Sequence, residues 1–180
     1  MTKNLIISAS AIIGIVAIAG TSFTLGANQQ PKSMSSESYS TTGNKQGNCA
    51  KIDETGVKAL FTRWNNSLQT GSPKKVVENY AEDGVLLPTV SNTPRTNHQL
   101  MENYFEEFLL KKPFGTINTS TVRIDCNMAF DVGTYTFDLT NPETKVTAKV
   151  PARYSYVYKF IDGKWLIAHH HSSVMPEKIS

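Results

Sequence analysis

The 180-residue sequence lacks most features that identify the common enzyme classes. It is too short for a kinase catalytic domain or a two-domain dehydrogenase, and it has neither a glycine-rich phosphate loop nor an HRD-type catalytic loop. Residue spacing reveals no Ser-His-Asp or Cys-His arrangement. We therefore expect no kinase activity and no cofactor, and the sequence leaves open whether the chain is an enzyme.

Clustered basic residues are also missing. No run of Lys and Arg is longer than a pair, and residues 49–180 hold 15 basic and 14 acidic side chains. Nucleic-acid binding depends on clustered cations that release counterions, and calmodulin targets are basic amphipathic helices. The sequence favours neither partner. Its content of 39% hydrophobic and 9% aromatic residues can instead supply the packed core of one domain.

The first part of the chain has almost no charge, since none occurs between Lys3 and Lys32. Residues 1–27 combine a basic start, an apolar run and a small-residue exit, the layout of a secretory signal peptide. An uncleaved anchor is the alternative, because about 20 apolar residues span a bilayer. Residues 28–48 are polar and predict a disordered linker before a domain at 49–180. Either way we expect an exported domain, periplasmic or secreted, that meets a membrane only through an uncleaved leader.

The sequence contains only two cysteines, Cys49 and Cys126. In an exported chain such a pair predicts a disulfide, which would tie down the first residue of the domain. The alternative is two unpaired thiols, with Cys126 filling a strand position. Neither cysteine has a neighbouring histidine or basic residue, so a reactive thiol is disfavoured.

Apolar residues at helical spacing predict three helices in the first half of the domain. The first ends at Gly71, and the second begins at Ser72 and buries Tyr80. A short strand over 85–87 follows. A capping box of Thr96 and Gln99 opens the third helix. The apolar positions of the first and third helices are Val57, Leu60, Phe61, Trp64 and Leu68, and Leu100, Met101, Tyr104, Phe105, Phe108 and Leu109.

After Pro113 the apolar period changes from about 3.6 to 2, which predicts strands. The four strand-like stretches are 116–125, 129–139, 146–160 and 164–173. Asp162 and Gly163 between the last two are a strong hairpin signal. The expected fold is α+β: three N-terminal helices packed on a strongly curved antiparallel sheet, with a pocket between the two layers.

This order of elements resembles the nuclear transport factor 2-like (SnoaL-like) superfamily, whose fold is a cone. The stretches NYFEEFLLKKP at 103–113 and DGKWLIAHHHSS at 162–173, followed by VMPE, make a closer match. Together they resemble the association (hub) domain of calcium/calmodulin-dependent protein kinase II and its stand-alone bacterial relatives, over about residues 50–177. The resemblance implies a homo-oligomer, a dimer or larger ring, with a deep pocket for an unknown small molecule.

Strand alternation divides the side chains of the last two strands between two faces. Tyr154, Tyr156, Tyr158 and Phe160 are expected on one face, and Arg153, Ser155, Val157 and Lys159 on the other. In the final strand Leu166, Ala168, His170 and Ser172 are expected to share a side, opposite Trp165, Ile167, His169 and His171. A slip of one residue would exchange both sets.

The resemblance places His170 and Ser172 in the pocket. Arginines that bind small carboxylates in the kinase hub align here with Phe137, Tyr156 and Ser172, so that anion site does not carry over. Arg95, Arg123 or Arg153 would have to supply a charge. Arg153 is the best of these three as a pocket residue, and a structural ion pair across a subunit or sheet contact is its alternative. The expected ligand-binding residues are Tyr135, Phe137, Tyr154, Tyr156, Tyr158, His170, Ser172 and Arg153.

The three adjacent histidines do not predict a metal site. Alternation sends only His169 and His171 to the same face, and a zinc site needs a third or fourth ligand. The remaining histidine, His98, opens the third helix. We therefore expect no bound metal.

The leading hypothesis is an exported, non-kinase module that oligomerises and binds a small molecule. Its convex sheet face would otherwise expose Trp165, Ile167, His169, His171 and Val157. The alternative is a SnoaL-like or ketosteroid-isomerase-like enzyme, with His170 and Tyr156 doing acid–base chemistry on a small molecule. Such isomerases place a carboxylate in the pocket, and none of Asp125, Asp131 and Asp138 is clearly inward, which favours binding.

Overall fold

The computed structural model describes residues 49–89 and 91–177. The predicted leader at 1–27 and linker at 28–48 lie outside the described residues. Within the described part, no helix is long and apolar enough to cross a membrane. The elements are three helices, α1 (Glu54–Leu68), α2 (Pro73–Val77) and α3 (His98–Leu109), and five strands, β1 (Tyr80–Leu87), β2 (Phe114–Asp125), β3 (Met128–Thr140), β4 (Thr147–Ile161) and β5 (Lys164–Val174).

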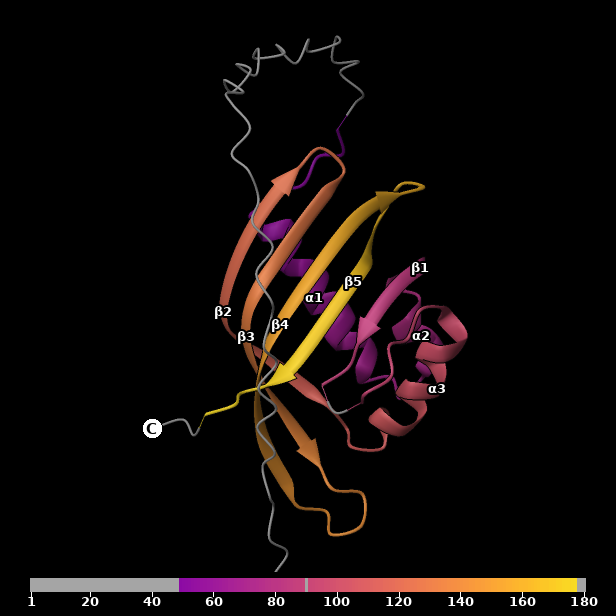
Figure 1. The fold of residues 1–180 in the computed structure, drawn as a ribbon, viewed down its shortest axis with the longest axis vertical. Helices are drawn as coiled ribbons and strands as arrows, with labels where there is room; N and C mark the ends of the chain where they lie inside the picture. Colours follow the sequence, from indigo (N-terminus) through magenta and orange to yellow (C-terminus); the bar gives the residue numbers. More distant parts are fainter. Residues whose placement is uncertain (1–48, 90, 178–180) are drawn as a thin grey trace, which may run out of the picture. The chain divides into compact units, whose positions relative to one another are not determined.

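The five strands form one sheet in the order β1-β5-β4-β3-β2 (Figure 1). Strands β2 to β5 are a meander of antiparallel neighbours, as predicted, but β1 pairs with β5 in parallel. The sheet is therefore mixed, and the prediction of a purely antiparallel sheet was wrong. Between β1 and β5 the chain crosses over through α3 and the whole meander, so no hairpin forces these two strands to run in opposite directions.

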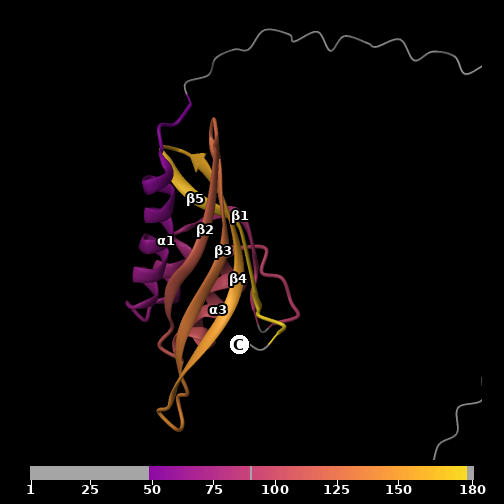
Figure 2. The ribbon, with the colours of Figure 1, turned by 90° about the vertical axis from the view of Figure 1, so that its left-hand side faces the viewer.

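The helices all pack on the same face of the sheet. Figure 2 shows α1 lying along this face, and α3 contacts the same layer through Phe105 on Tyr80 and Phe108 on Phe137. We call this the inward face and the opposite side the open face. The described residues confirm the predicted α+β class and the three predicted helices.

Two predicted helix boundaries differ in the structure. Tyr80 is the first residue of β1, whereas the sequence placed it on the second helix. Asn97 caps α3, because its side chain accepts a hydrogen bond from the Leu100 amide, which leaves the predicted capping box of Thr96 and Gln99 unformed. An Asx side chain at the N-cap competes directly with a threonine one residue earlier.

Hydrogen bonds join helix α1 to two strands of the sheet, β2 and β5. The Asn65 side chain donates to the Gly115 carbonyl at 3.0 Å and accepts from the Gly115 amide at 2.8 Å, which joins α1 to the start of β2. A Cβ atom at Gly115 would lie 3.1 Å from the Phe61 ring and 3.2 Å from the Phe137 ring, so a larger residue would require these buried rings to shift. On the other side, Arg63 donates to the Trp165 carbonyl at 2.6 Å in β5.

A disulfide joins Cys49 to Cys126, with a Cα–Cα distance of 4.5 Å. Cys126 lies in the β2–β3 turn, and the Ala50 amide donates to the Asn127 side chain of the same turn at 2.9 Å. The chain entering α1 is thus tied to the tip of a hairpin 77 residues away. In the chain-entropy model, closing a loop of this size stabilises the fold by about 4 kcal/mol.

A β-bulge in β5 changes which side chains point inward. Val157 pairs with His169 but Tyr158 pairs with Ile167, so Ala168 has no partner on β4. An extra residue shifts the alternation by one position. Trp165 and Ile167 therefore share the inward face with His170, being 8% and 0% exposed. The prediction that Trp165 and Ile167 lie on the convex face was wrong.

Candidate functional site

Most of the predicted pocket residues meet on the inward face beneath α1. The Tyr156 ring stacks on His170 at 4.1 Å between centroids, and Trp64 of α1 contacts both rings at 5.8 and 5.2 Å. Burial raises the pKa of the Tyr156 and Tyr158 hydroxyls well above 10, so both stay protonated. The predicted residues brought together here are Tyr135, Phe137, Tyr154, Tyr156, Tyr158, His170 and Ser172, and all of them are buried.

His170 lies in the centre of this cluster and is 3% exposed. A hydrogen bond of 2.9 Å joins its Nδ1 to the Tyr80 hydroxyl, while Nε2 has no partner among the described residues. Burial, helped by the charges of His169 and His171, lowers the pKa of His170 to about 3. The imidazole is therefore neutral near pH 7.

The space beside His170 is small. A cavity of about 20 Å³ lies between the imidazole, Ser172 and the α3 side chains Tyr104 and Phe108. This volume accommodates about one water molecule. Ser172 is itself held by hydrogen bonds from the Tyr135 hydroxyl at 2.5 Å and with Thr89 Oγ1. The predicted deep pocket is thus filled by the protein's own rings, and in this conformation His170 cannot touch a substrate.

Arg153 does not join the other predicted site residues. It pairs with Thr134 and Ser173 on the open face and is exposed, so its charge is solvated and needs no partner. The expectation that Arg153 serves the pocket was wrong, because alternation directs it away from the tyrosines.

Arg95 is a half-buried cation beside the rings of α3. Its guanidinium lies 5.8 Å from the centre of the Tyr104 ring. Arg95 and Lys111 line a surface groove of about 330 Å³ whose wall includes Tyr104 and Phe108, the same side chains that close the cavity beside His170. These two rings separate a charged groove from the buried tyrosines.

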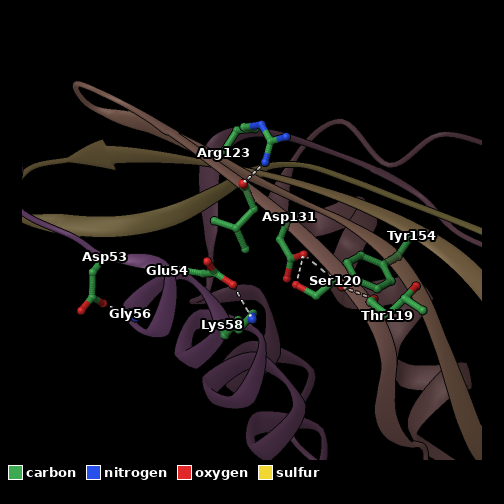
Figure 3. A network of polar contacts seen from close by, with 10 residues as sticks. Asp53, Glu54, Gly56, Lys58, Thr119, Ser120, Arg123, Asp131 and Tyr154 are labelled. Carbon is green, nitrogen blue, oxygen red and sulfur yellow. Dashed lines mark hydrogen bonds and ion pairs between the residues drawn. The ribbon is translucent and has the colours of Figure 1, made fainter.

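Asp131 is a site residue that the sequence analysis missed. It lies on the inward face of β3 and is only 1% exposed, and its Oδ1 accepts from Ser120 Oγ at 2.7 Å and from the Tyr154 hydroxyl at 3.1 Å (Figure 3). Burial raises its pKa, and the two hydrogen bonds and the charge of Lys58 oppose that rise only in part. The expectation that no carboxylate is inward was wrong. The signal was present, since Asp131 stands an even number of residues before Tyr135.

Asp138 and the outer histidines lie on the opposite side of the sheet. Asp138 pairs with Lys149 at 2.8 Å in a largely exposed contact. His169 and His171 pair with Val157 and Ser155 on the open face, in the direction that alternation predicted. Residues 49–89 and 91–177 contain no group of three His, Cys, Asp or Glu side chains that could hold a metal.

The burial of His170 predicts a specific loss of stability in acid. Because its folded pKa of about 3 lies below the unfolded value of 6.5, only the unfolded chain takes up a proton between these values. The contribution of His170 is complete above pH 6.5 and is lost as the pH falls toward 3, at about 1.4 kcal/mol per pH unit. Urea unfolding at a series of pH values gives the free energy of unfolding of wild type and of His170→Gln. Below pH 6.5 this free energy should fall more steeply with decreasing pH in wild type than in His170→Gln.

The matched control for this measurement is His171→Gln, which removes the neighbouring histidine from the open face. Its dependence on pH should follow that of wild type. Equal acid slopes for His170→Gln and wild type would show that His170 is protonated in the folded protein, contrary to its burial.

Comparisons with known proteins identify the family. Residues 53–176 match the family described as calcium/calmodulin dependent protein kinase II association domain. The crystal structure of a Xanthomonas campestris protein assigned to this association domain is 51% identical, with a TM-score of 0.68, covering 73% of this chain and 97% of that one. Among curated proteins nothing matches the chain.

More distant solved structures share the fold alone. An NTF2-like protein with a cystatin-like fold from Novosphingobium aromaticivorans is 10% identical, with a TM-score of 0.56, covering 72% of this chain and 94% of that one. A ketosteroid isomerase-like protein from Erwinia carotovora atroseptica is 15% identical, with a TM-score of 0.58, covering 70% and 100%. The family match over residues 53–176 and the 51% identical relative together show that the chain belongs to the calcium/calmodulin-dependent protein kinase II association domain family.

Proposed function

We propose that this protein is an exported, non-kinase association module that forms a homo-oligomer through the open face of its sheet. The observation that carries the proposal is the family match over residues 53–176, since association domains of this family oligomerise. Export is supported by the apolar run in residues 1–27 and by the Cys49–Cys126 disulfide, a bond that persists in oxidising compartments.

The open face has the composition of an interface. Phe130, Val132 and Val157 lie side by side on it, across β3 and β4, and Phe130 is 38% exposed. Three cations, Arg123, Arg153 and Lys159, flank these apolar residues as a polar rim. An apolar centre with a charged rim is typical of protein–protein interfaces, and with all helices on the inward face nothing in the described chain covers it.

A lysine at position 157 should break this assembly. Val157 lies between Phe130 and His169, so Val157→Lys would bring like charges from two copies together and desolvate them. We expect sedimentation velocity to show a shift toward monomer, with an unchanged far-ultraviolet spectrum because the side chain points outward. Val146→Lys, in the β3–β4 loop, makes the same exchange at a position 64% exposed and is the control. A Val157→Lys protein that assembles like wild type would place the interface elsewhere.

The small-molecule pocket forms the second part of the proposal. Since only about 20 Å³ is open beside His170, we propose that a ligand enters from the groove of Arg95 and Lys111 when Tyr104 and Phe108 turn aside. Arg95 and Lys111 outnumber Glu107, the acid that lines the same groove, and the net positive charge favours a small anion. Tyr135 and Ser172 supply hydroxyls beyond the rings. This arrangement gives the carboxylate-binding role to Arg95 and not to Arg153.

Titration with butyrate tests the pocket. Arg95→Met should weaken butyrate binding about tenfold, which corresponds to about 1.4 kcal/mol. Arg153→Met removes the cation that the sequence favoured, and it should leave the affinity unchanged. If Arg153→Met weakens binding and Arg95→Met does not, the ligand binds on the open face and the groove plays no part.

Acid–base catalysis on a small molecule is the second candidate function, favoured by one observation. Asp131 is an inward carboxylate with a raised pKa, the kind of group that isomerases of this fold would require. Asp131 is a better candidate than His170 and Tyr156, because it lines an open cleft whereas they lie behind closed rings. Assembly requires no such group, so loss of turnover in Asp131→Asn with intact assembly would separate the two functions.

A further inference from the structure

A second cleft lies on the other side of α1 from the tyrosine cluster. It has a volume of about 590 Å³, within the usual range for small-molecule sites. One wall is α1 and the other is the pair β2 and β3. Apolar side chains form much of its lining, namely Phe61, Phe114 and Ile117, and Phe114 is 44% exposed.

Among the residues that the structure describes, Asp131 is the only acidic one that lines the cleft, and it lies at its floor. Its Oδ1 carries both hydrogen bonds, from Ser120 and Tyr154, while its Oδ2 has no partner among residues 49–89 and 91–177. No cation within the described chain forms an ion pair with it. Oδ2 is not one of the buried polar atoms that lack a partner, so it is reached from the cleft, where a positively charged group can pair with it.

A lysine that lines the cleft, Lys58, is already paired with another residue. Lys58 Nζ lies 2.6 Å from Glu54 Oε1, one turn earlier on α1, and Figure 3 shows this pair on the helix that faces Asp131. Together Glu54, Lys58 and Asp131 carry one net negative charge. The cleft therefore combines an apolar wall, a buried anion and a lysine that is already paired with Glu54 outside the lining, which suits a cation with an apolar tail.

We propose that this cleft binds a small primary amine, whose ammonium group pairs with Asp131 and whose aromatic or aliphatic tail packs on Phe61, Phe114 and Ile117. The ammonium donates to Asp131 Oδ2, the oxygen that the protein leaves free. This site is separate from the anion groove at Arg95 and does not depend on the proposed assembly.

Phenethylamine is the probe, because it joins an ammonium group to one aromatic ring. Calorimetric titration of the disulfide-bonded domain near neutral pH should give saturable binding. Asp131→Asn keeps the shape of the side chain and should weaken binding at least about tenfold. Asp138→Asn removes an acid of the same strand from the opposite face and should bind like wild type. 2-Phenylethanol, which lacks the charge, should bind at least about tenfold more weakly than phenethylamine.

Two further variants test the geometry without touching the buried carboxylate. Phe114→Ala removes a half-exposed ring from the apolar wall and should weaken binding several-fold in a folded protein. Lys58→Met removes a like charge and should leave binding equal or tighter. The proposal is overturned if wild type does not bind phenethylamine, if the alcohol binds as well as the amine, or if Lys58→Met abolishes binding.

Discussion

The packing of α1 on the aromatic layer of β3, β4 and β5 is the interaction on which the rest of the structure depends. Trp64 and Phe61 are almost fully buried against the rings of Tyr135, Tyr156 and their neighbours. Burial of such large side chains contributes about 2–3 kcal/mol each. The Asn65–Gly115 hydrogen bonds and the disulfide hold the helix in place over this layer.

Three functional consequences follow from this packing. It fills the interior, so that His170 is left with a water-sized space and a neutral imidazole. It moves the open volume to the far side of α1, where Asp131 forms the floor of the cleft. It also puts all three helices on one face, which leaves the other face of the sheet for assembly. The buried polar groups therefore differ in role. His170 is structural, whereas Asp131 has one oxygen that lacks a hydrogen bond within the described chain and faces a cleft.

The fold was largely predictable because periodicity reports burial directly. The apolar residues of α1 repeat at helical spacing and the tyrosines of β4 alternate along the strand. Both sets face the core as expected. The bulge at Ala168 was not predictable, because alternation assumes one residue per position and carries no mark of an insertion. The parallel pairing of β1 with β5 was missed for a related reason, since it depends on a long crossover and not on any local turn signal.

The site was less predictable than the fold. Tyr156 and His170 were correctly placed inward, yet sequence alone does not tell a filled interior from a pocket, since both need the same inward aromatics. Arg153 was assigned to the pocket although strand alternation had placed it on the face opposite the tyrosines. Asp131 was not recognised as inward although it shares the phase of Tyr135. Arg95 lies in an irregular segment, where no period indicates direction.

The central claim is that the sheet has a closed inward face containing His170 and an open face containing His169 and His171. Modification of the histidines by diethyl pyrocarbonate tests this claim, because mass spectrometry can locate the modified residues among three adjacent histidines of one peptide. In dilute native protein we expect His169 and His171 to react and His170 to react only after unfolding, because it is 3% exposed. Native His170 reacting as fast as His169 would contradict the account.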